Sequence, residues 1–187
     1  MLLLCSPAKA GAQKPAPDWA PAFAGELRVT NPAERQDFIA RFGELFEHSP
    51  WVVERTADRL PLADLHAGLM QVVQDATPGE RLALIGAHPE LAGKAAIDGR
   101  LTEASAAEQA SAGLDRMTRE EYDRFHALNA AYSAKFGFPF IICVRLTDKA
   151  GILAAMERRL ANNRETEIAT ALDQIGEIVR LRLESMA

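Results

Sequence analysis

Apolar residues recur every three or four positions through most of the chain after Asn31, and this spacing gives a helix one apolar face. The longest stripe of this kind lies near the C-terminus: Ile168, Ala171, Leu172, Ile175 and Val179. A second stripe lies upstream of it: Tyr122, Phe125, Leu128, Tyr132 and Phe136. No pair of segments shows a convincing two-residue alternation of the kind that marks β-strands. The pattern therefore predicts an all-α fold, a single compact domain of six to eight helices.

Polar residues followed by proline mark several helix starts, because Asn, Ser and Thr cap a helix and proline suits its first turn. This motif occurs at Asn31-Pro32, Ser49-Pro50 and Thr77-Pro78, and the stretch that begins at Thr118 fits a capping box with Glu121. With the later signals, the expected helices cover about 32–48, 62–75, 77–85, 118–136, 148–160 and 162–184, with further starts at Pro50 and within 101–109. Irregular loops around His88 and Phe138 interrupt them.

The first 30 residues differ in composition from the rest of the chain. They are rich in proline and alanine, and they show no helical spacing of apolar residues. A segment of this kind buries little apolar surface and cannot offset the entropy lost on ordering. We therefore expect residues 1–30 to form a disordered extension and residues 31–187 to form the helical domain.

Composition and charge narrow the possible functions. The formal net charge of −5 and the scattered basic residues argue against a nucleic acid or an anionic membrane as partner. No window approaches the roughly 18 apolar residues of a membrane span, and residues 1–4 are too short for a signal peptide. Cys5 and Cys143 lie far apart without metal-ligand spacing, so neither a metal site nor a disulfide framework is expected. A reduced cytoplasm fits this pattern best, with Cys143 as a buried thiol.

His88 is the first candidate for chemistry. It lies in the loop 86–93, which begins and ends with glycine, and Pro89 directly follows it. Proline fixes the local backbone, and a histidine held in this way can act as a general acid or base because its ordinary pKa is about 6.5. The structural alternative is a loop histidine that makes one ordinary hydrogen bond.

Ser105, Glu108 and Gln109 form a second candidate group. Their spacing places them on one face of a helix. Ser105 and Glu108 also fit a capping box, which would give both residues a structural task that does not exclude a functional one. Gln109 has no part in such a box.

Arg182 and the segment 137–141 complete the candidate residues. Arg182 continues the C-terminal apolar stripe three residues beyond Val179, so its guanidinium faces inward and needs an anionic or carbonyl partner. The alternative is a side chain that snorkels to water or interacts with the helix C-terminus. The segment 137–141 is non-helical, so its free amides could face a ligand, although a plain core-filling connector is equally compatible with the sequence.

Together these residues resemble the OHCU (2-oxo-4-hydroxy-4-carboxy-5-ureidoimidazoline) decarboxylase family over about 31–183. The matching motifs are the segments 87–93, 105–114, 128–132, 135–143 and 180–183. They include Ala87-His88-Pro89-Glu90, Ser105-Ala106-Ala107-Glu108-Gln109, Phe136-Gly137-Phe138-Pro139-Phe140 and Arg180-Leu181-Arg182-Leu183. The resemblance implies that His88 and Glu108 are catalytic, with Glu108 as the partner of His88. It implies substrate binding by Pro89, Ser105, Gln109, Phe138, Phe140, Ile141 and Arg182.

The resemblance also implies a reaction and its setting. The reaction is the stereospecific decarboxylation of OHCU to (S)-allantoin in urate breakdown, by a homodimer that needs no metal or organic cofactor. The extension 1–30 lies outside the match, and we expect the chain to catalyse this one step without a fused second enzyme domain. Two alternatives remain: a non-catalytic helical binding module of the same fold, and a decarboxylase of a related ureido acid.

Overall fold

The computed structural model of the chain describes residues 28–93 and 101–186. Within them the chain forms eight α-helices, two 3₁₀ turns and no strand, which confirms the predicted all-α fold. The elements are α2 (Pro32–Phe42), η1 (Gly43–Leu45), α3 (Trp51–Ala57), α4 (Leu65–Asp75), α5 (Pro78–Gly86), α7 (Glu103–Ser111), α8 (Arg119–Phe136), η2 (Val144–Leu146), α9 (Lys149–Arg159) and α10 (Arg164–Met186). The predicted disordered extension falls almost entirely outside the described residues.

Local capping explains where most helices begin. The Asn31 side chain accepts a hydrogen bond from the Glu34 amide at 3.0 Å, as the sequence predicted for the start of α2. Complete capping boxes begin α5 at Thr77 and α8 at Thr118. Each of these starts depends only on residues within one turn of the helix, so sequence could reveal it.

Ser49 does not cap a helix as predicted: α3 begins one residue later, with Pro50 at the N-cap position and no side-chain hydrogen bond. Two further predicted helix boundaries are wrong by three residues or more. The helix expected to reach about residue 48 ends at Phe42, and the 3₁₀ turn η1 follows it. The helix expected from residue 62 begins at Leu65, because Asp64 is its cap and accepts from the Ala67 amide at 2.9 Å. The 3₁₀ turn η1 packs against the C-terminal helix α10.

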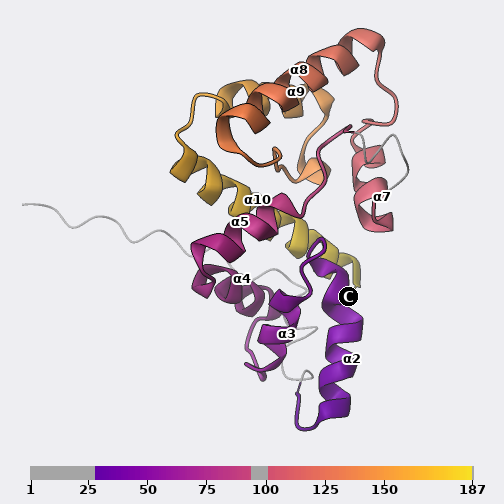
Figure 1. Cartoon of the computed structure of the whole chain (residues 1–187). Coiled ribbons are helices and arrows are strands. Elements are labelled where there is room, and N and C mark those ends of the chain that lie inside the picture. Colours follow the sequence, from indigo (N-terminus) through magenta and orange to yellow (C-terminus); the bar gives the residue numbers. More distant parts are fainter. Residues whose placement is uncertain (1–27, 94–100, 187) are drawn as a thin grey trace, which may run out of the picture.

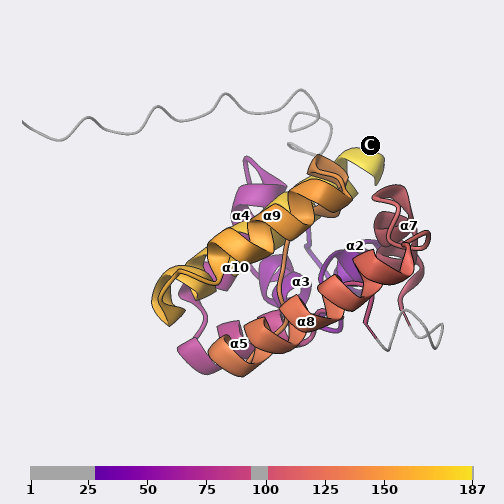
Figure 2. The ribbon, with the colours of Figure 1, turned by 90° about the horizontal axis from the view of Figure 1, so that it is seen from above.

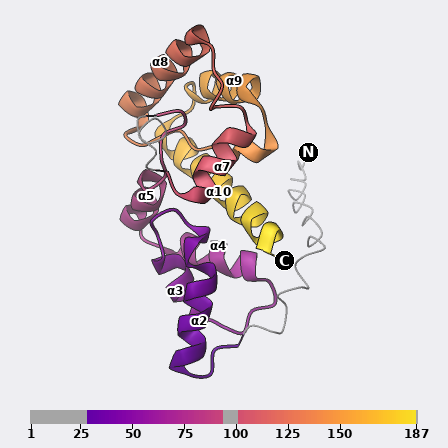
Figure 3. The same ribbon diagram turned by 90° about the vertical axis from the view of Figure 1, so that its right-hand side faces the viewer.

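Helix α10 organises the fold. It runs between a group formed by α2, α3 and α4 and a group formed by α8 and α9 (Figure 1). Seen from above, α9 overlies α10 and α8 runs in roughly the same direction (Figure 2). The side view again places α10 between the two groups (Figure 3), and it packs directly against α4, α5 and η1.

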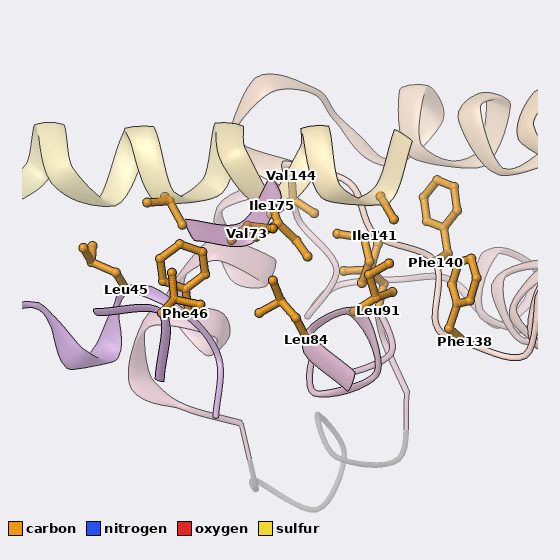
Figure 4. Close-up of a cluster of buried hydrophobic side chains, with 14 of the residues drawn as sticks. Leu45, Phe46, Val73, Leu84, Leu91, Phe138, Phe140, Ile141, Val144 and Ile175 are labelled. Carbon is orange, nitrogen blue, oxygen red and sulfur yellow. The ribbon is translucent and has the colours of Figure 1, made fainter. Parts of the chain in front are cut away.

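The buried side chains of α10 form one wall of the core. Ala171, Ile175, Val179 and Leu183 have no exposed surface, as expected for a stripe with helical spacing. Figure 4 shows Ile175 of α10 above Leu84 of α5, with Leu91 beside Ile141 further along the same cluster. No helix in the described part of the chain is long and apolar enough to cross a membrane.

The segment after α8 is held by aromatic packing. Gly137 ends α8 with a left-handed conformation, φ 79°, which glycine adopts without strain. Tyr132 then lies edge-on to Phe140, with ring centroids 5.1 Å apart, and Phe138 stacks on Phe136 at 6.0 Å. The chain therefore leaves α8 abruptly and stays non-helical over 137–143, until the 3₁₀ turn η2.

Candidate active site

Four parts of the chain converge on one pocket: the end of α5, the helix α7, the segment 140–145 and the C-terminal half of α10. The pocket is lined by His88, Pro89, Leu91, Ser105, Glu108, Gln109, Phe140, Ile141, Ile142, Cys143, Val144, Arg145, Ile178 and Arg182. Eight of the nine residues predicted for the site are in this lining. The ninth, Phe138, packs behind it in the aromatic cluster, and the catalytic and binding roles of all nine residues stay predictions.

His88 lies at the C-terminal end of α5, where helix carbonyls lack partners. Its Nδ1 lies 3.0 Å from the Leu84 carbonyl oxygen, which can only accept, so Nδ1 carries the hydrogen. In the neutral ring the unprotonated nitrogen is therefore Nε2. Burial lowers the pKa of His88, and the hydrogen bond to Leu84 and the charge of Glu47 oppose this change without cancelling it. The pocket thus holds a neutral imidazole with a fixed tautomer.

Glu108 pairs with Arg182. The Arg182 Nε donates to Glu108 Oε1 at 2.8 Å and Nη2 donates to Oε2 at 2.9 Å, which is the bidentate geometry that makes such pairs strong. The remaining guanidinium nitrogen, Nη1, donates to the Leu45 carbonyl at 3.2 Å. Burial lowers the pKa of Arg182, but the hydrogen bonds and charges of Glu108 and Glu47 together more than offset this and raise it. The inward-facing arginine predicted from the apolar stripe therefore has anionic and carbonyl partners.

The predicted capping box of Ser105 and Glu108 is wrong. Thr102 caps α7, and its hydroxyl accepts from the Ser105 amide at 3.3 Å. Ser105 lies inside the helix and is 6% exposed, with its hydroxyl directed to Glu47. Glu108 consequently has no capping task and is available to Arg182.

Gln109 holds the histidine loop. Its Oε1 accepts from the Ala92 amide at 3.0 Å, and this fixes a residue with the unusual φ of 50°. The Asn129 amide group donates to the Leu91 carbonyl at 2.9 Å and secures the same turn from α8. Since the Gln109 oxygen is engaged, its NH₂ group is the part that a ligand in the pocket could accept from.

Glu47 is a site residue that the sequence did not reveal. It lies between η1 and α3, is 3% exposed, and accepts from the Thr102 hydroxyl at 2.8 Å and the Ser105 hydroxyl at 2.9 Å. Its Oε2 also lies 3.7 Å from Arg182 Nη2. The one signal available in the sequence was an acidic residue directly after the apolar pair Leu45-Phe46, which is weak without knowledge of its partners.

Two other side chains that could be reactive are Cys143 and His66. Burial raises the pKa of the Cys143 thiol, so the nucleophilic thiolate is disfavoured. His66 lies outside the pocket with Nε2 2.9 Å from the Gly176 carbonyl. Among residues 28–93 and 101–186, no three potential ligands gather in a way that could hold a metal ion. The chemistry available in the pocket is thus ionic binding, amide hydrogen bonding and proton transfer at His88.

The pocket of this all-α domain combines a neutral histidine, an arginine–glutamate pair and a non-helical backbone segment. Such a pocket is suited to binding a small polar molecule. Residues 31–184 match the family model described as OHCU decarboxylase, and the chain belongs to this family. A protein from Haloferax volcanii named 2-oxo-4-hydroxy-4-carboxy-5-ureidoimidazoline decarboxylase is 41% identical over 160 residues, 84% of this chain and 93% of its own length.

Two solved structures share the fold. A crystal structure of (S)-allantoin synthase superposes with a TM-score of 0.63 at 28% identity, over 81% of this chain and 49% of its own. A crystal structure of OHCU decarboxylase in the presence of (S)-allantoin has a TM-score of 0.64 at 20% identity, over 78% of this chain and 96% of its own. The family resemblance found in the sequence motifs is therefore confirmed.

Proposed function

We propose that this protein decarboxylates OHCU to (S)-allantoin in the breakdown of urate. The observation that carries the proposal is the convergence of His88, Glu108 and Arg182 in one pocket. The 41% identity to a named OHCU decarboxylase supports it over nearly the whole length of that relative. In this proposal His88 and Glu108 are the catalytic residues, and Pro89, Ser105, Gln109, Phe138, Phe140, Ile141 and Arg182 bind the substrate.

The substrate itself supplies the electron sink that decarboxylation requires. The bond between C4 and the carboxylate breaks and CO₂ leaves. The released electron pair forms a double bond between C4 and C5, and the π electrons of the adjacent C=N bond move to its nitrogen, which takes up a proton. The C4 hydroxyl then loses its proton as C4 becomes a carbonyl, and C5 gains a hydrogen on one face. The net balance is the uptake of one proton for each CO₂ released. The protein has to bind the anion, hold it in one orientation and deliver that proton.

The charges of the site favour a proton on His88 when the substrate is bound. Two carboxylates, Glu47 and Glu108, face the single guanidinium of Arg182. A substrate carboxylate adds another negative charge in a buried pocket, where electrostatic interactions are strong. Its charge raises the pKa of His88 and so opposes the lowering that burial causes. His88 Nε2 then takes up a proton on binding and returns it during the reaction.

Arg182 and the loop amides hold the oxygens of the ring or the ureido group in this proposal. Glu108 acts through Arg182, with which it shares two hydrogen bonds, and through its charge beside His88. This differs from a simple His88–Glu108 hydrogen-bonded pair. Glu108 therefore has two tasks in this proposal: it positions the Arg182 guanidinium, and its negative charge balances the positive charge of the protonated His88 ring.

The test is direct turnover of the purified protein. Freshly generated OHCU should give optically active allantoin, followed by circular dichroism, much faster than the spontaneous reaction. Racemic allantoin at the spontaneous rate would refute the proposal and favour a non-catalytic module of the same fold. Activity confined to another ureido acid would instead identify a related decarboxylase.

We further propose that the protein forms a homodimer and that it is located in the cytoplasm, a reducing compartment. The family resemblance supports the dimer, and the free, buried thiol of Cys143 is compatible with a reducing compartment. Analytical ultracentrifugation at micromolar concentration tests the assembly, and a monomer across that range would contradict it. Cell fractionation tests the location.

A further inference from the structure

The pocket segment 140–143 is held from behind by two helices. Arg159 of α9 donates from Nη1 to the Ile141 carbonyl at 2.7 Å. Gln174 of α10 accepts from the Cys143 amide through Oε1 at 2.9 Å. Neither side chain lines the pocket. Both therefore contact the backbone of the pocket wall and would not contact a ligand in the pocket.

Arg159 is itself fixed by a buried ion pair. Its Nε donates to Glu167 Oε1 at 2.7 Å, and Glu167 has no exposed surface. Tyr132 and Asn162 also donate to this carboxylate, and the guanidinium lies 4.4 Å from the centroid of the Phe140 ring. Burying such a pair costs desolvation energy, and an apolar pair of similar volume often stabilises a protein as well. The hydrogen bond that Arg159 makes to the segment is therefore a better guide to its role than any contribution of the ion pair to stability.

The two hydrogen bonds fix which way the segment faces. They engage the carbonyl of one residue and the amide of the second residue after it, and in extended chain these groups point to the same side. Cys143 has extended backbone angles, φ −72° and ψ 94°. Because alternate residues of an extended chain face opposite sides, the N–H and C=O of Ile142 are then expected to face away from α9 and α10. Ile142 is part of the pocket lining.

We propose that Arg159 and Gln174 are positioning residues that hold the pocket segment 140–143 in its ligand-facing orientation. This inference rests on the proposed function for the nature of the ligand, a ureido acid with amide groups. Helix α10 adds a link of its own, because Gln174, Ile178 and Arg182 are four residues apart and share one face. Helix α10 therefore fixes the position of the segment 140–143 relative to the Arg182 guanidinium.

Gln174→Leu is the decisive variant, since it removes the acceptor and keeps a side chain of similar size. We expect kcat/KM for OHCU to fall roughly 3- to 10-fold, the range for one lost hydrogen bond, while the protein stays folded. Gln174→Glu keeps an acceptor and should retain most of the activity. Gln74→Leu, on an exposed position of α4, is the matched control and should behave as the wild type.

Arg159→Lys gives a second perturbation. Lysine keeps the positive charge beside Glu167, but its single ammonium cannot reproduce the fork that joins Glu167 and the Ile141 carbonyl. A rise in KM with a fall in kcat, measured well below the melting temperature, would support positioning. Lower thermal stability with wild-type kcat and KM would assign Arg159 to stability alone and overturn its part of the proposal.

Hydrogen exchange separates this proposal from the proposed activity. The Cys143 amide should exchange slowly in the wild type and clearly faster in Gln174→Leu, whether or not OHCU is the substrate. Unchanged exchange, or wild-type kcat and KM in folded Gln174→Leu, would overturn the positioning role. Faster exchange in a protein that does not turn over OHCU would refute the proposed function and leave the role of Gln174 in holding the segment intact.

Discussion

Glu108→Gln removes the charge closest to Arg182 and keeps the length of the side chain. In the wild type both carboxylate oxygens accept from the guanidinium, at 2.8 and 2.9 Å. Glutamine has one acceptor oxygen, and its NH₂ group cannot accept, so at least one of these hydrogen bonds is lost. The substitution does not remove a helix cap, because Thr102 caps α7.

The stability effect follows from what Arg182 retains. A hydrogen bond to a charged group contributes about 1.5–3 kcal/mol. Arg182 keeps the Leu45 carbonyl at 3.2 Å and the Glu47 carboxylate at 3.7 Å, so its charge is not left without partners. We expect the free energy of unfolding to fall by about 1.5–3 kcal/mol, which for a domain of this size lowers Tm by roughly 3–12 °C.

The effect on turnover should be much larger than the effect on stability. If Glu108 places Arg182 and balances the charge on His88, kcat should fall by roughly 10²–10⁴-fold, the range for general acid–base groups. His88→Asn should give a fall of similar size. The double variant should be little worse than either single one, since residues that act as a unit are not additive.

The assay is kcat on freshly generated OHCU, read from the circular dichroism of allantoin, with Tm measured on the same samples. Wild-type kcat with a lowered Tm would leave Glu108 as a structural partner of Arg182 and remove it from the catalytic residues. An additive loss in the double variant would refute the idea that Glu108 and His88 act together.

Three further predictions concern charge and metal. Glu47→Gln removes a charge that raises the pKa of His88, so the alkaline limb of the kcat profile should move to lower pH; an unmoved limb would contradict this. Because the pKa of His88 is lowered on folding, the free energy of unfolding should fall as pH drops below about 6.5, less so in His88→Asn; urea denaturation at two pH values checks it. EDTA should leave the rate unchanged, and a loss restored by a divalent metal would refute a metal-free reaction.

The sequence predicted those parts of the site that depend on neighbours along the chain. The starts of α5 and α8 depend on a threonine and a glutamate three residues apart, so a capping box could be recognised without any tertiary information. Arg182 could be placed on the inner face by helical spacing alone. The family resemblance then assigned His88 and Glu108 to one site, and the structure brings them to the same pocket.

Partners that lie far apart in sequence could not be predicted in this way. The sequence favoured Ser105 as the cap of α7, but Thr102 caps this helix, and the buried carboxylate of Glu47, 58 residues from Ser105, accepts from the hydroxyl groups of both. Likewise, a histidine and a glutamate suggested a pair, but a guanidinium offers the carboxylate a full opposite charge and two donors. Glu47 itself left only a weak local signal, an acidic residue after an apolar pair.

The partners of Arg182 also have a consequence for folding. Arg182 binds Glu108, 74 residues away, and the Leu45 carbonyl, 137 residues away. Contacts between such distant parts of a chain close large loops and form late. During refolding from urea, helical signal should therefore return before enzymatic activity does. Because the guanidinium needs both ends of the domain in place, a partly folded chain would hold most of its helices and have no working site.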